Sequence, residues 1–263
     1  MQLTKDFTST FKASANASDA LIVSMSPFSG FLLAKRDLGH DTLHVFEKVN
    51  TYYTYGVDQL GQAITMAARK MSKRRVLFLG SSKSGYGALF CGRSSQLERS
   101  SSLVFSPVTQ VYPLEKPLYF KTFPWFMDLV AKKPHVKRCA ERFGQLPASP
   151  KSIFYKETII HGEYCDHDRN EILALKRRTI NPGFMRVRHI PTRSHNVISM
   201  FAADKTSLDS FTDTCITSAS RENELPWLDV DTQHLLKEAP VIYDTIKGET
   251  LQGLIESALQ EIA

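Results

Sequence analysis

Short apolar runs alternate with segments of helical spacing along most of this chain. The run Ala20–Met25 is ended by Ser26-Pro27, and a second run covers Arg75–Leu79. Between them, Asp58–Met71 places apolar residues three and four positions apart, which predicts an amphipathic helix. Four more segments have the composition of strands: Thr42–Phe46, Ser102–Phe105, Ser152–Ile160 and Met185–Ile190. Strands that alternate with helices predict an α/β fold with a mainly parallel sheet flanked by helices.

Two segments depart from this alternation. Residues 108–150 follow the strand Ser102–Phe105 and are rich in aromatic residues, prolines and basic residues. We interpret them as an inserted lid or cap over the strand ends, the alternative being a proline-broken helix of the core. Residues 221–263 predict polar helices with one apolar face that cover the sheet. The 263 residues fit a single domain that carries this insertion.

Composition narrows the class of protein. Hydrophobic residues make up 42% and charged residues 23% of the chain, as in ordinary globular proteins. The 4 cysteines are scattered and form no Cys-x-x-Cys pair, so neither a disulfide framework nor a thiolate zinc site is predicted. The sequence has no apolar run long enough for a transmembrane helix and no signal-peptide pattern near Met1. We therefore expect a cytoplasmic protein.

Basic residues exceed acidic residues, and the formal net charge is +6. They cluster at 70–75, 132–138 and 176–178. Such clusters are typical of solvated helix ends, where cations also suit the helix dipole. The alternative is that they attract an anionic partner, such as a charged polysaccharide, a nucleotide-bearing donor or a membrane surface. No recognisable nucleic-acid-binding module accompanies them, so nucleic acid is not an expected partner.

The strongest candidate for chemistry is Gly80–Leu89, with the sequence GSSKSGYGAL, which directly follows a predicted strand. A strand that ends in small residues and continues as a helix is the layout of a nucleophile elbow, in which a strained turn presents a serine hydroxyl. Ser82 occupies the nucleophile position, with the small residues Gly80 and Ser84 two positions to either side. The alternatives are a plain strand–glycine–helix turn and a phosphate-binding loop, although the Walker spacing of glycine and lysine is absent.

A serine nucleophile needs a base, and the base needs an orienting acid. In this layout the acid and then a histidine follow the serine, each just beyond a later strand. After the next-to-last predicted strand we favour Asp166 as the acid, with Asp168 as the alternative that would otherwise cap the following helix. After the last predicted strand we favour His195 as the base over His189, which lies within the strand itself.

Metal ligation is a competing interpretation of one of these segments. His161, Asp166, His167 and Asp168 offer imidazole and carboxylate donors, which suit zinc or manganese. Three of them share one short turn, however, and neither HxH nor HExxH spacing is present. We therefore predict no bound metal and no resident cofactor.

Together these motifs resemble the α/β-hydrolase superfamily of serine esterases, lipases and acyltransferases. The resemblance covers roughly Asp19 to Thr206 and rests on the segments GSSKSGYGAL, HGEYCDHD and SHNV. It implies an α/β-hydrolase-like fold and a catalytic triad of Ser82, Asp166 and His195, with the serine as nucleophile.

The resemblance also implies an oxyanion hole made of two backbone N–H groups. One belongs to Lys83, which follows the nucleophile, and the other to the loop after the first predicted strand. In that loop Ser26 or Phe28 is the candidate, because Pro27 has no N–H. The chain departs from the family pattern: it lacks an HGGG-type loop, has Ser84 where glycine is usual, and has too short a leading segment for the complete hairpin. A sheet of about six or seven strands is therefore expected.

The expected activity is hydrolysis or transfer of an ester-bound acyl group through an acyl-enzyme. The acceptor is water in an esterase and a hydroxyl in an O-acetyltransferase, for which acetyl-CoA is the co-substrate. Similar proteins in bacterial surface-polysaccharide pathways favour a small-molecule or saccharide ester as substrate, and the basic clusters favour an anionic one. The other class is a non-catalytic binding or adaptor module in surface-polysaccharide assembly, in which Ser82 and His195 would lie too far apart for a hydrogen bond. No oligomeric state is predicted.

Overall fold

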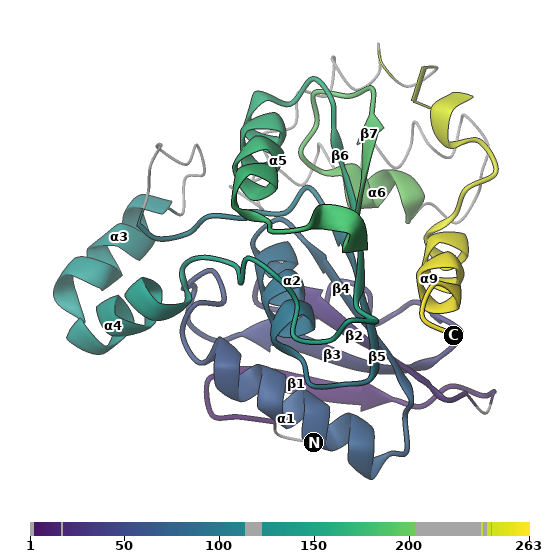
Figure 1. Ribbon diagram of the computed structural model, residues 1–263, viewed down its shortest axis with the longest axis horizontal. Coiled ribbons are helices and arrows are strands. Elements are labelled where there is room, and N and C mark those ends of the chain that lie inside the picture. The colour runs from purple at the N-terminus through teal and green to yellow at the C-terminus, as the bar shows by residue number, and fades with distance from the viewer. Residues whose placement is uncertain (1–2, 17, 114–122, 203–237, 239–240, 243) are drawn as a thin grey trace.

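In the part of the chain that the structure describes, seven strands form one mainly parallel sheet (Figure 1). The computed structural model describes residues 3–16, 18–113, 123–202, 238, 241–242 and 244–263. The strands are β1 (Phe7–Lys12), β2 (Ala20–Ser26), β3 (Asp41–Glu47), β4 (Arg75–Ser81), β5 (Arg99–Phe105), β6 (Lys156–Gly162) and β7 (Met185–Ile190). Their order is β1-β3-β2-β4-β5-β6-β7; β1 pairs antiparallel with β3, and the other neighbours are parallel. The carboxyl ends of β2 to β7 therefore share one edge of the sheet.

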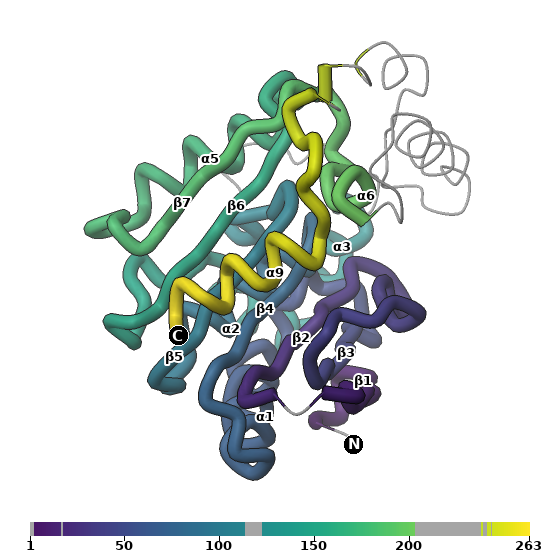
Figure 2. Tube along the Cα trace, turned by 90° about the vertical axis from the view of Figure 1, so that its right-hand side faces the viewer, coloured from purple at the N-terminus to yellow at the C-terminus, as the bar shows by residue number. Residues whose placement is uncertain are grey.

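Helices lie on both faces of this sheet (Figure 2). They are α1 (Val57–Lys70), α2 (Lys83–Ser94), α3 (Phe123–Lys132), α4 (Pro134–Phe143), α5 (Asp166–Arg178), α6 (Val197–Phe201) and α9 (Leu251–Gln260), with the 3-10 turn η1 (Pro182–Phe184). One hydrophobic cluster joins α1, α2 and α5 to the first face, and another joins α6 and α9 to the second. The predicted α/β class, a mainly parallel sheet flanked by helices, is confirmed. None of the described helices combines the length and hydrophobicity that a bilayer-spanning helix requires.

The central strands are buried on both faces, which explains their nearly continuous apolar sequences. All seven positions of β2 are buried, and six of the seven positions of β4. Because successive side chains point to opposite faces, Leu21 and Val23 belong to one hydrophobic cluster and Ala20 and Ile22 to the other. A parallel strand covered by helices on both sides has no polar face to expose.

Three strands differ most from the prediction, and one of them, β5, begins at Arg99 and not at the predicted Ser102. The pattern did not predict β1, whose sequence FTSTFK has one fully buried residue, Phe7, and an exposed Phe11. This edge strand is held mainly by backbone pairing with β3, so its hydrophobic signal is weak. The predicted strand Ser152–Ile160 begins too early, because the chain turns at Ser152 and buries Tyr155 before β6 starts at Lys156.

Helices α3 and α4 form the described part of the predicted insertion and extend to one side of the sheet (Figure 1). Phe123 and Phe126 of α3 pack on Tyr52, with ring centroids 5.8 and 5.5 Å away. A backbone bridge between Gln110 and Gln145 joins the two ends of the insertion. Residues 114–122 of the segment 108–150 lie outside the described residues, and its role as a lid stays a prediction.

The predicted covering region 221–263 is described only in part, since 221–237, 239–240 and 243 lie outside the described residues. Its last helix, α9, crosses β4 and β5 (Figure 2). Leu251, Ile255 and Leu259 of α9 are buried in the second hydrophobic cluster.

A buried ion pair joins α2 to β6. Arg93 Nη2 and Nε donate to the two carboxylate oxygens of Glu157 at 2.6 and 3.0 Å, and the side chains are 1% and 0% exposed. Arg93 Nη1 donates to the carbonyl oxygen of Pro147 at 2.7 Å, and Tyr155 Oη donates to Glu157 at 3.0 Å. Because both charges are out of contact with water, neither is stable without the other.

We expect Arg93→Met to lower the free energy of unfolding by about 3–5 kcal/mol, because it leaves the Glu157 carboxylate buried and unpaired. The double variant Arg93→Met/Glu157→Met recovers most of this loss. Lys132→Met, which removes one partner of the exposed pair Lys132–Asp128, changes stability by less than about 0.5 kcal/mol. Urea unfolding followed by circular dichroism measures all three. If Arg93→Met lowers the free energy of unfolding as little as Lys132→Met does, Arg93 and Glu157 do not form the buried ion pair described here.

Candidate active site

Ser82 stands in a strained turn between β4 and α2. Its backbone has φ 53° and ψ −127°, outside the conformations that residues other than glycine usually adopt. The N–H of Ser82 donates to the carbonyl oxygen of Phe105 at 3.0 Å, and its carbonyl oxygen accepts from the N–H of Val108 at 3.1 Å. Both partners belong to the end of the neighbouring strand β5 and the loop after it, so the sheet itself fixes the turn.

The small residues on either side of Ser82 have separate tasks. A Cβ atom on Gly80 would lie 2.5 Å from the carbonyl oxygen of Ser84, so this position excludes any side chain. Ser84, which stands where glycine is usual, is fully buried. Its Oγ accepts from the N–H of Ser81 at 3.0 Å and lies 3.0 Å from the carbonyl oxygen of Met25. The hydroxyl therefore ties the turn to the end of β2.

Three side chains meet at the carboxyl edge of the sheet. Ser82 follows β4, Asp168 lies in the first turn of α5 after β6, and His195 lies between β7 and α6. Ser82 Oγ is 2.9 Å from His195 Nε2, and His195 Nδ1 is 2.6 Å from Asp168 Oδ1. All three are buried. The two residues predicted as nucleophile and base are therefore in hydrogen-bond contact, unlike the separation expected of a non-catalytic module.

The carboxylate that meets His195 is Asp168, and the preference for Asp166 is wrong on this point. The side chain of Asp166 is 89% exposed and lies 3.7 Å from Arg169 on the outer face of α5. The side chain of Asp168 is 0% exposed. Both residues are helical, and successive helix positions rotate by about 100°, so residues two apart point to opposite sides. Asp168 therefore faces the sheet edge.

Two further donors hold the Asp168 carboxylate. Ser106 Oγ donates to Oδ2 at 2.6 Å, and the N–H of Gly162 donates to the same oxygen at 3.1 Å. Burial by itself raises the pKa of Asp168, but the charge of His195 and the hydrogen bonds from His195 and Ser106 outweigh it, so the pKa is lowered. Sequence reasoning missed Ser106; the available signal was a hydroxyl directly after β5, at the edge where the other site residues lie.

This arrangement fixes the proton positions needed for base catalysis. An ionised Asp168 accepts a hydrogen bond, so His195 carries its proton on Nδ1. Nε2 then has a free lone pair and accepts the hydrogen bond from Ser82 Oγ. A serine hydroxyl in this position can lose its proton to the imidazole as it attacks a carbonyl carbon.

The predicted oxyanion donors lie around the same turn. Lys83 is the first residue of α2, and Ser26 is the last residue of β2. Because β2 pairs with β4 in parallel, the loop after β2 lies beside the turn that carries Ser82. Ser26 Oγ donates to the carbonyl oxygen of Phe28 at 3.2 Å, which tightens this loop. Which N–H groups bind an oxyanion stays a prediction.

A buried glutamate organises the loop beyond β3, and sequence reasoning missed it. Glu47 accepts from the N–H groups of Thr51 at 3.0 Å and Tyr53 at 3.2 Å, and from the Thr51 hydroxyl. Burial raises the pKa of Glu47 to about 7. In the same loop Tyr52 and Tyr53 have φ of 56° and 61°. Tyr53 Oη donates to the carbonyl oxygen of Ser26 at 2.7 Å, so the loop also supports the end of β2.

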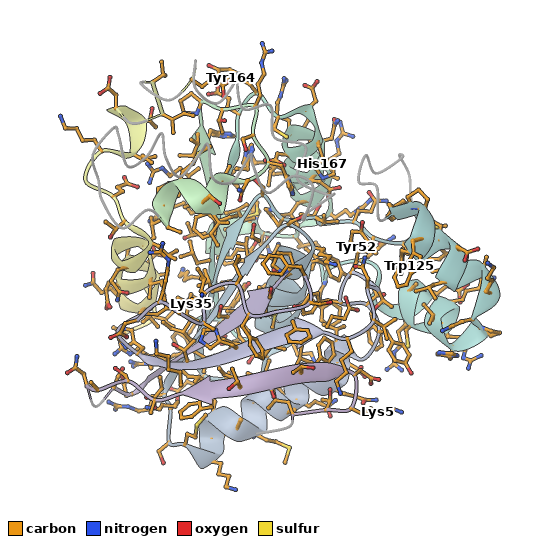
Figure 3. The ribbon with its side chains drawn as sticks, turned by 180° about the vertical axis from the view of Figure 1, so that it is seen from behind. Lys5, Lys35, Tyr52, Trp125, Tyr164 and His167 are labelled. Carbon is orange, nitrogen blue, oxygen red and sulfur yellow. The ribbon has the colours of Figure 1, made fainter. Side chains whose placement is uncertain are left out.

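The other histidines of the region take different places. His189 is on β7, where its ring packs against His161 with centroids 4.6 Å apart. The ring of His167, labelled in Figure 3, lies 5.4 Å from that of His195. Burial and the charge of His195 lower the pKa of His167 to about 4, so it is neutral at neutral pH.

The four residues weighed as metal ligands do not converge, since Asp166 points into solvent. Among the described residues, the group close enough for an ion is Cys165, Asp168 and His195, with ligand atoms within 4.8 Å. Burial raises the pKa of the Cys165 thiol to about 12. Asp168 and His195 are hydrogen-bonded to each other, and His195 also to Ser82, so these residues fit a serine–histidine–carboxylate site better than a metal centre.

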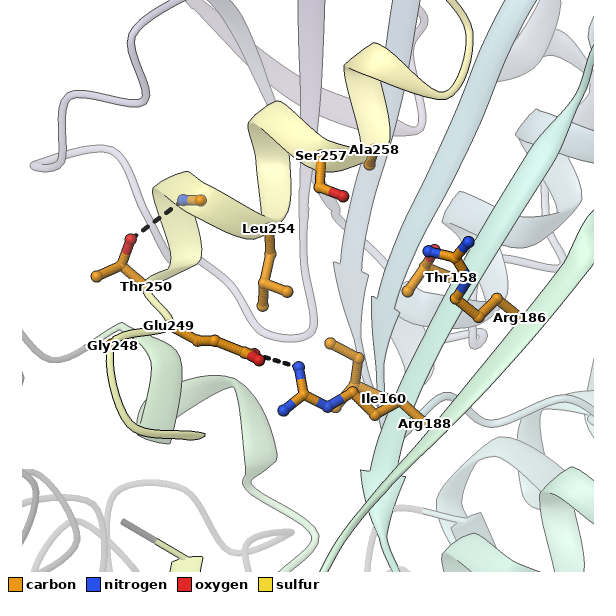
Figure 4. Close-up of a pocket in the computed structure, with 11 residues that line it drawn as sticks. Thr158, Ile160, Arg186, Arg188, Gly248, Glu249, Thr250, Leu254, Ser257 and Ala258 are labelled. Atoms are coloured by element: carbon orange, nitrogen blue, oxygen red, sulfur yellow. Dashed lines mark hydrogen bonds and ion pairs between the residues drawn. The ribbon is translucent and has the colours of Figure 1, made fainter. Parts of the chain in front are cut away.

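A cavity of about 380 Å³ lies elsewhere, between β6, β7 and α9, and Figure 4 shows residues that line it. Arg188 forms an ion pair with Glu249 at this cavity. Arg186, also in its wall, pairs with Glu261 at 2.6 Å. Neither Ser82 nor His195 lines the cavity, so it is separate from the candidate active site.

No protein-family model matches the sequence, and no curated protein matches it. Similar solved structures include a capsule O-acetyltransferase of Neisseria meningitidis serogroup A, at 17% identity over 71% of this chain and 84% of that one, with a TM-score of 0.47. A thermophilic esterase from Thermogutta terrifontis is 13% identical over 86% and 92% of the two chains, with a TM-score of 0.43. A lipase-esterase related protein from Clostridium acetobutylicum is 10% identical over 84% and 99%, with a TM-score of 0.47.

Proposed function

We propose that this protein is a serine-dependent ester hydrolase or acyl transferase that works through an acyl-enzyme on Ser82. The observation that carries the proposal is the line of contacts from Ser82 through His195 to Asp168, at 2.9 and 2.6 Å. Strained backbone clusters at functional sites, and a serine within hydrogen-bond reach of an oriented imidazole is the arrangement that activates a serine nucleophile.

Acylation begins when Ser82 Oγ attacks the ester carbonyl carbon. His195 Nε2 takes the hydroxyl proton, and Asp168 stabilises the imidazolium and keeps its orientation. Backbone N–H groups of Lys83 and of the loop at Ser26 and Phe28 stabilise the oxyanion, a contribution of about 3–4 kcal/mol per donor in other enzymes. The bond from the carbonyl carbon to the leaving oxygen of an ester, or to the sulfur of acetyl-CoA, then breaks, and the leaving alkoxide or thiolate receives the proton from His195.

Deacylation repeats these steps with a new nucleophile. His195 removes a proton from water or from an acceptor hydroxyl, which attacks the acyl-Ser82 carbonyl, and Ser82 leaves with the returned proton. Water gives hydrolysis, and a hydroxyl gives transfer. We propose a saccharide as the partner of this reaction, because the net charge of +6 favours anionic substrates such as acidic sugars. Acetyl-CoA is the acyl donor in the transfer reaction.

Replacing the nucleophile should abolish covalent chemistry while the fold is kept. We expect Ser82→Ala to lose labelling by a fluorophosphonate and to lower hydrolysis of a short-chain 4-nitrophenyl ester at least about a thousandfold. Ser81→Ala, which removes the preceding hydroxyl on β4, keeps both. In-gel fluorescence and absorbance assays measure the two effects. Equal labelling of the wild type and Ser82→Ala would reject Ser82 as nucleophile.

The two neighbouring aspartates provide a matched comparison. We expect Asp168→Asn to lower kcat by about 10³–10⁴-fold, because an amide can neither fix the His195 tautomer nor stabilise the imidazolium. Asp166→Asn stays within about twofold of the wild type, because surface changes away from a site have small effects. Steady-state kinetics on one ester decide between them. A large loss for Asp166→Asn alone would restore Asp166 as the acid.

The acceptor decides between hydrolysis and transfer. If the protein is a transferase, CoA release from acetyl-CoA rises with saccharide concentration, and an O-acetylated saccharide accumulates. A thiol reagent follows the release, and mass spectrometry detects the acetylated product, with Ser82→Ala as control. One acidic and one neutral oligosaccharide test the proposed charge preference. Release of CoA at a rate independent of the saccharide, without acetylated product, would identify a hydrolase.

A further inference from the structure

The residue that follows the nucleophile, Lys83, carries a positive charge. Lys83 directly follows Ser82, and its side chain is only partly exposed. The ammonium donates a hydrogen bond to Asn50 Oδ1 and lies 5.9 Å from the centroid of the Tyr52 ring. Both contacts are favourable to a cation, but neither partner carries a negative charge.

Among the described residues, this charge lacks a counter-ion in direct contact. In the described part of the chain, no carboxylate lies within ion-pair distance of Lys83, and Glu47 acts on it only from farther away. The Glu47 carboxylate is already bound to Thr51 and Tyr53. Burial lowers the pKa of Lys83 to about 8, so the amine is still mostly charged at neutral pH. A partly desolvated cation of this kind is stabilised when a ligand brings an anion to it.

The sheet order places the partners of this charge at the same edge of the sheet as the candidate active site. Asn50 and Tyr52 follow β3, whereas Asp168 and His195 follow β6 and β7, on the other side of β4. Lys83 therefore lies across Ser82 from the base. Tyr52 packs beneath Phe123 and Phe126 of α3, so this corner joins the body of the protein to the α3–α4 pair (Figure 3).

We propose that the Lys83 ammonium, supported by Asn50, binds an anionic group of the ester substrate, a carboxylate or a phosphate. The inference rests on the proposed function, since it names the substrate charge that the Ser82 site selects. An ammonium has three donors and Asn50 takes one, so oxygen atoms of an anion can accept the others. Lys83 thus determines specificity through its side chain and contributes its backbone N–H to the oxyanion hole separately.

Kinetics with charge-matched esters test this assignment. The first pair places the anion on the acyl side: 4-nitrophenyl hemisuccinate is the anionic ester and 4-nitrophenyl butyrate the neutral one. The second pair places it on the alcohol side: 3-carboxy-4-nitrophenyl acetate is the anionic ester and 4-nitrophenyl acetate the neutral one. The wild type should favour the anionic member of at least one pair in kcat/KM. Lys83→Met should lower that preference about tenfold, the size of one charge-assisted contact, and Lys83→Arg should keep part of it.

Lys70→Met is the matched control, because Lys70 is an exposed lysine at the end of α1. It lies shortly before β4 begins, near the amino ends of the parallel strands and away from the edge that carries Ser82. This substitution removes the same charge and should keep the wild-type preference. If Lys83→Met and Lys70→Met show the same ratio of anionic to neutral rates as the wild type, the assignment is wrong. Thermal unfolding checks that Lys83→Met is folded, and Lys83→Gln replaces it if it is not.

Direct binding separates this inference from the proposed function. Phenylphosphonate and benzoate, with benzamide as neutral analogue, are titrated calorimetrically into the wild type, Lys83→Met and Lys70→Met. At least one anion should bind the wild type and Lys70→Met about tenfold more tightly than Lys83→Met, and the stronger anion identifies phosphate or carboxylate chemistry. Equal affinity in all three proteins overturns the role of Lys83. If the fluorophosphonate does not label Ser82 while anion binding still depends on Lys83, the proposed enzymatic function is wrong but the anion site is not.

Discussion

The backbone of Ser82, at φ 53°, is the constraint on which the rest of the site depends. This conformation is costly for a residue with a side chain, so it persists only where the surroundings over-determine it. Here the end of β5 and its loop bind both peptide groups of the turn, and Ser84 ties it to β2. Gly80 leaves space for the Ser84 carbonyl. With the turn fixed, the hydroxyl stays within 2.9 Å of His195.

Charge is compensated differently at three buried or half-buried positions. Arg93 and Glu157 neutralise each other inside the core and serve stability. Asp168 is stabilised by His195 and by neutral donors, which keeps it ionised and ready to orient the imidazole. Lys83 has an amide and an aromatic ring as its close partners, and among the described residues no carboxylate is within ion-pair distance, since Glu47 acts on it from farther away. The first two charges are balanced within the protein, whereas Lys83 is the one to which we propose that a ligand brings the balancing charge.

Sequence reasoning located the serine and the histidine because both follow from order along the chain. A strand, a small-residue turn and a helix mark Ser82, and His195 follows the last parallel strand. Contacts between elements could not be found in this way. Ser106 meets Asp168 from a different strand, and Glu47 supports its loop from within the core. The sequence pattern also did not predict the edge strand β1, because this strand is held by backbone pairing with β3 and not by apolar residues at regular spacing.

The sequence by itself determined the alternation of strands and helices, the mainly parallel sheet and the turn at Ser82, because these depend on local periodicity and on small residues at fixed spacing. The tertiary structure alone decided which carboxylate serves His195. Asp166 and Asp168 are two residues apart. The side of α5 on which each side chain lies depends on where that helix begins and how it packs on the sheet. Packing turned Asp168 inward and left Asp166 in solvent.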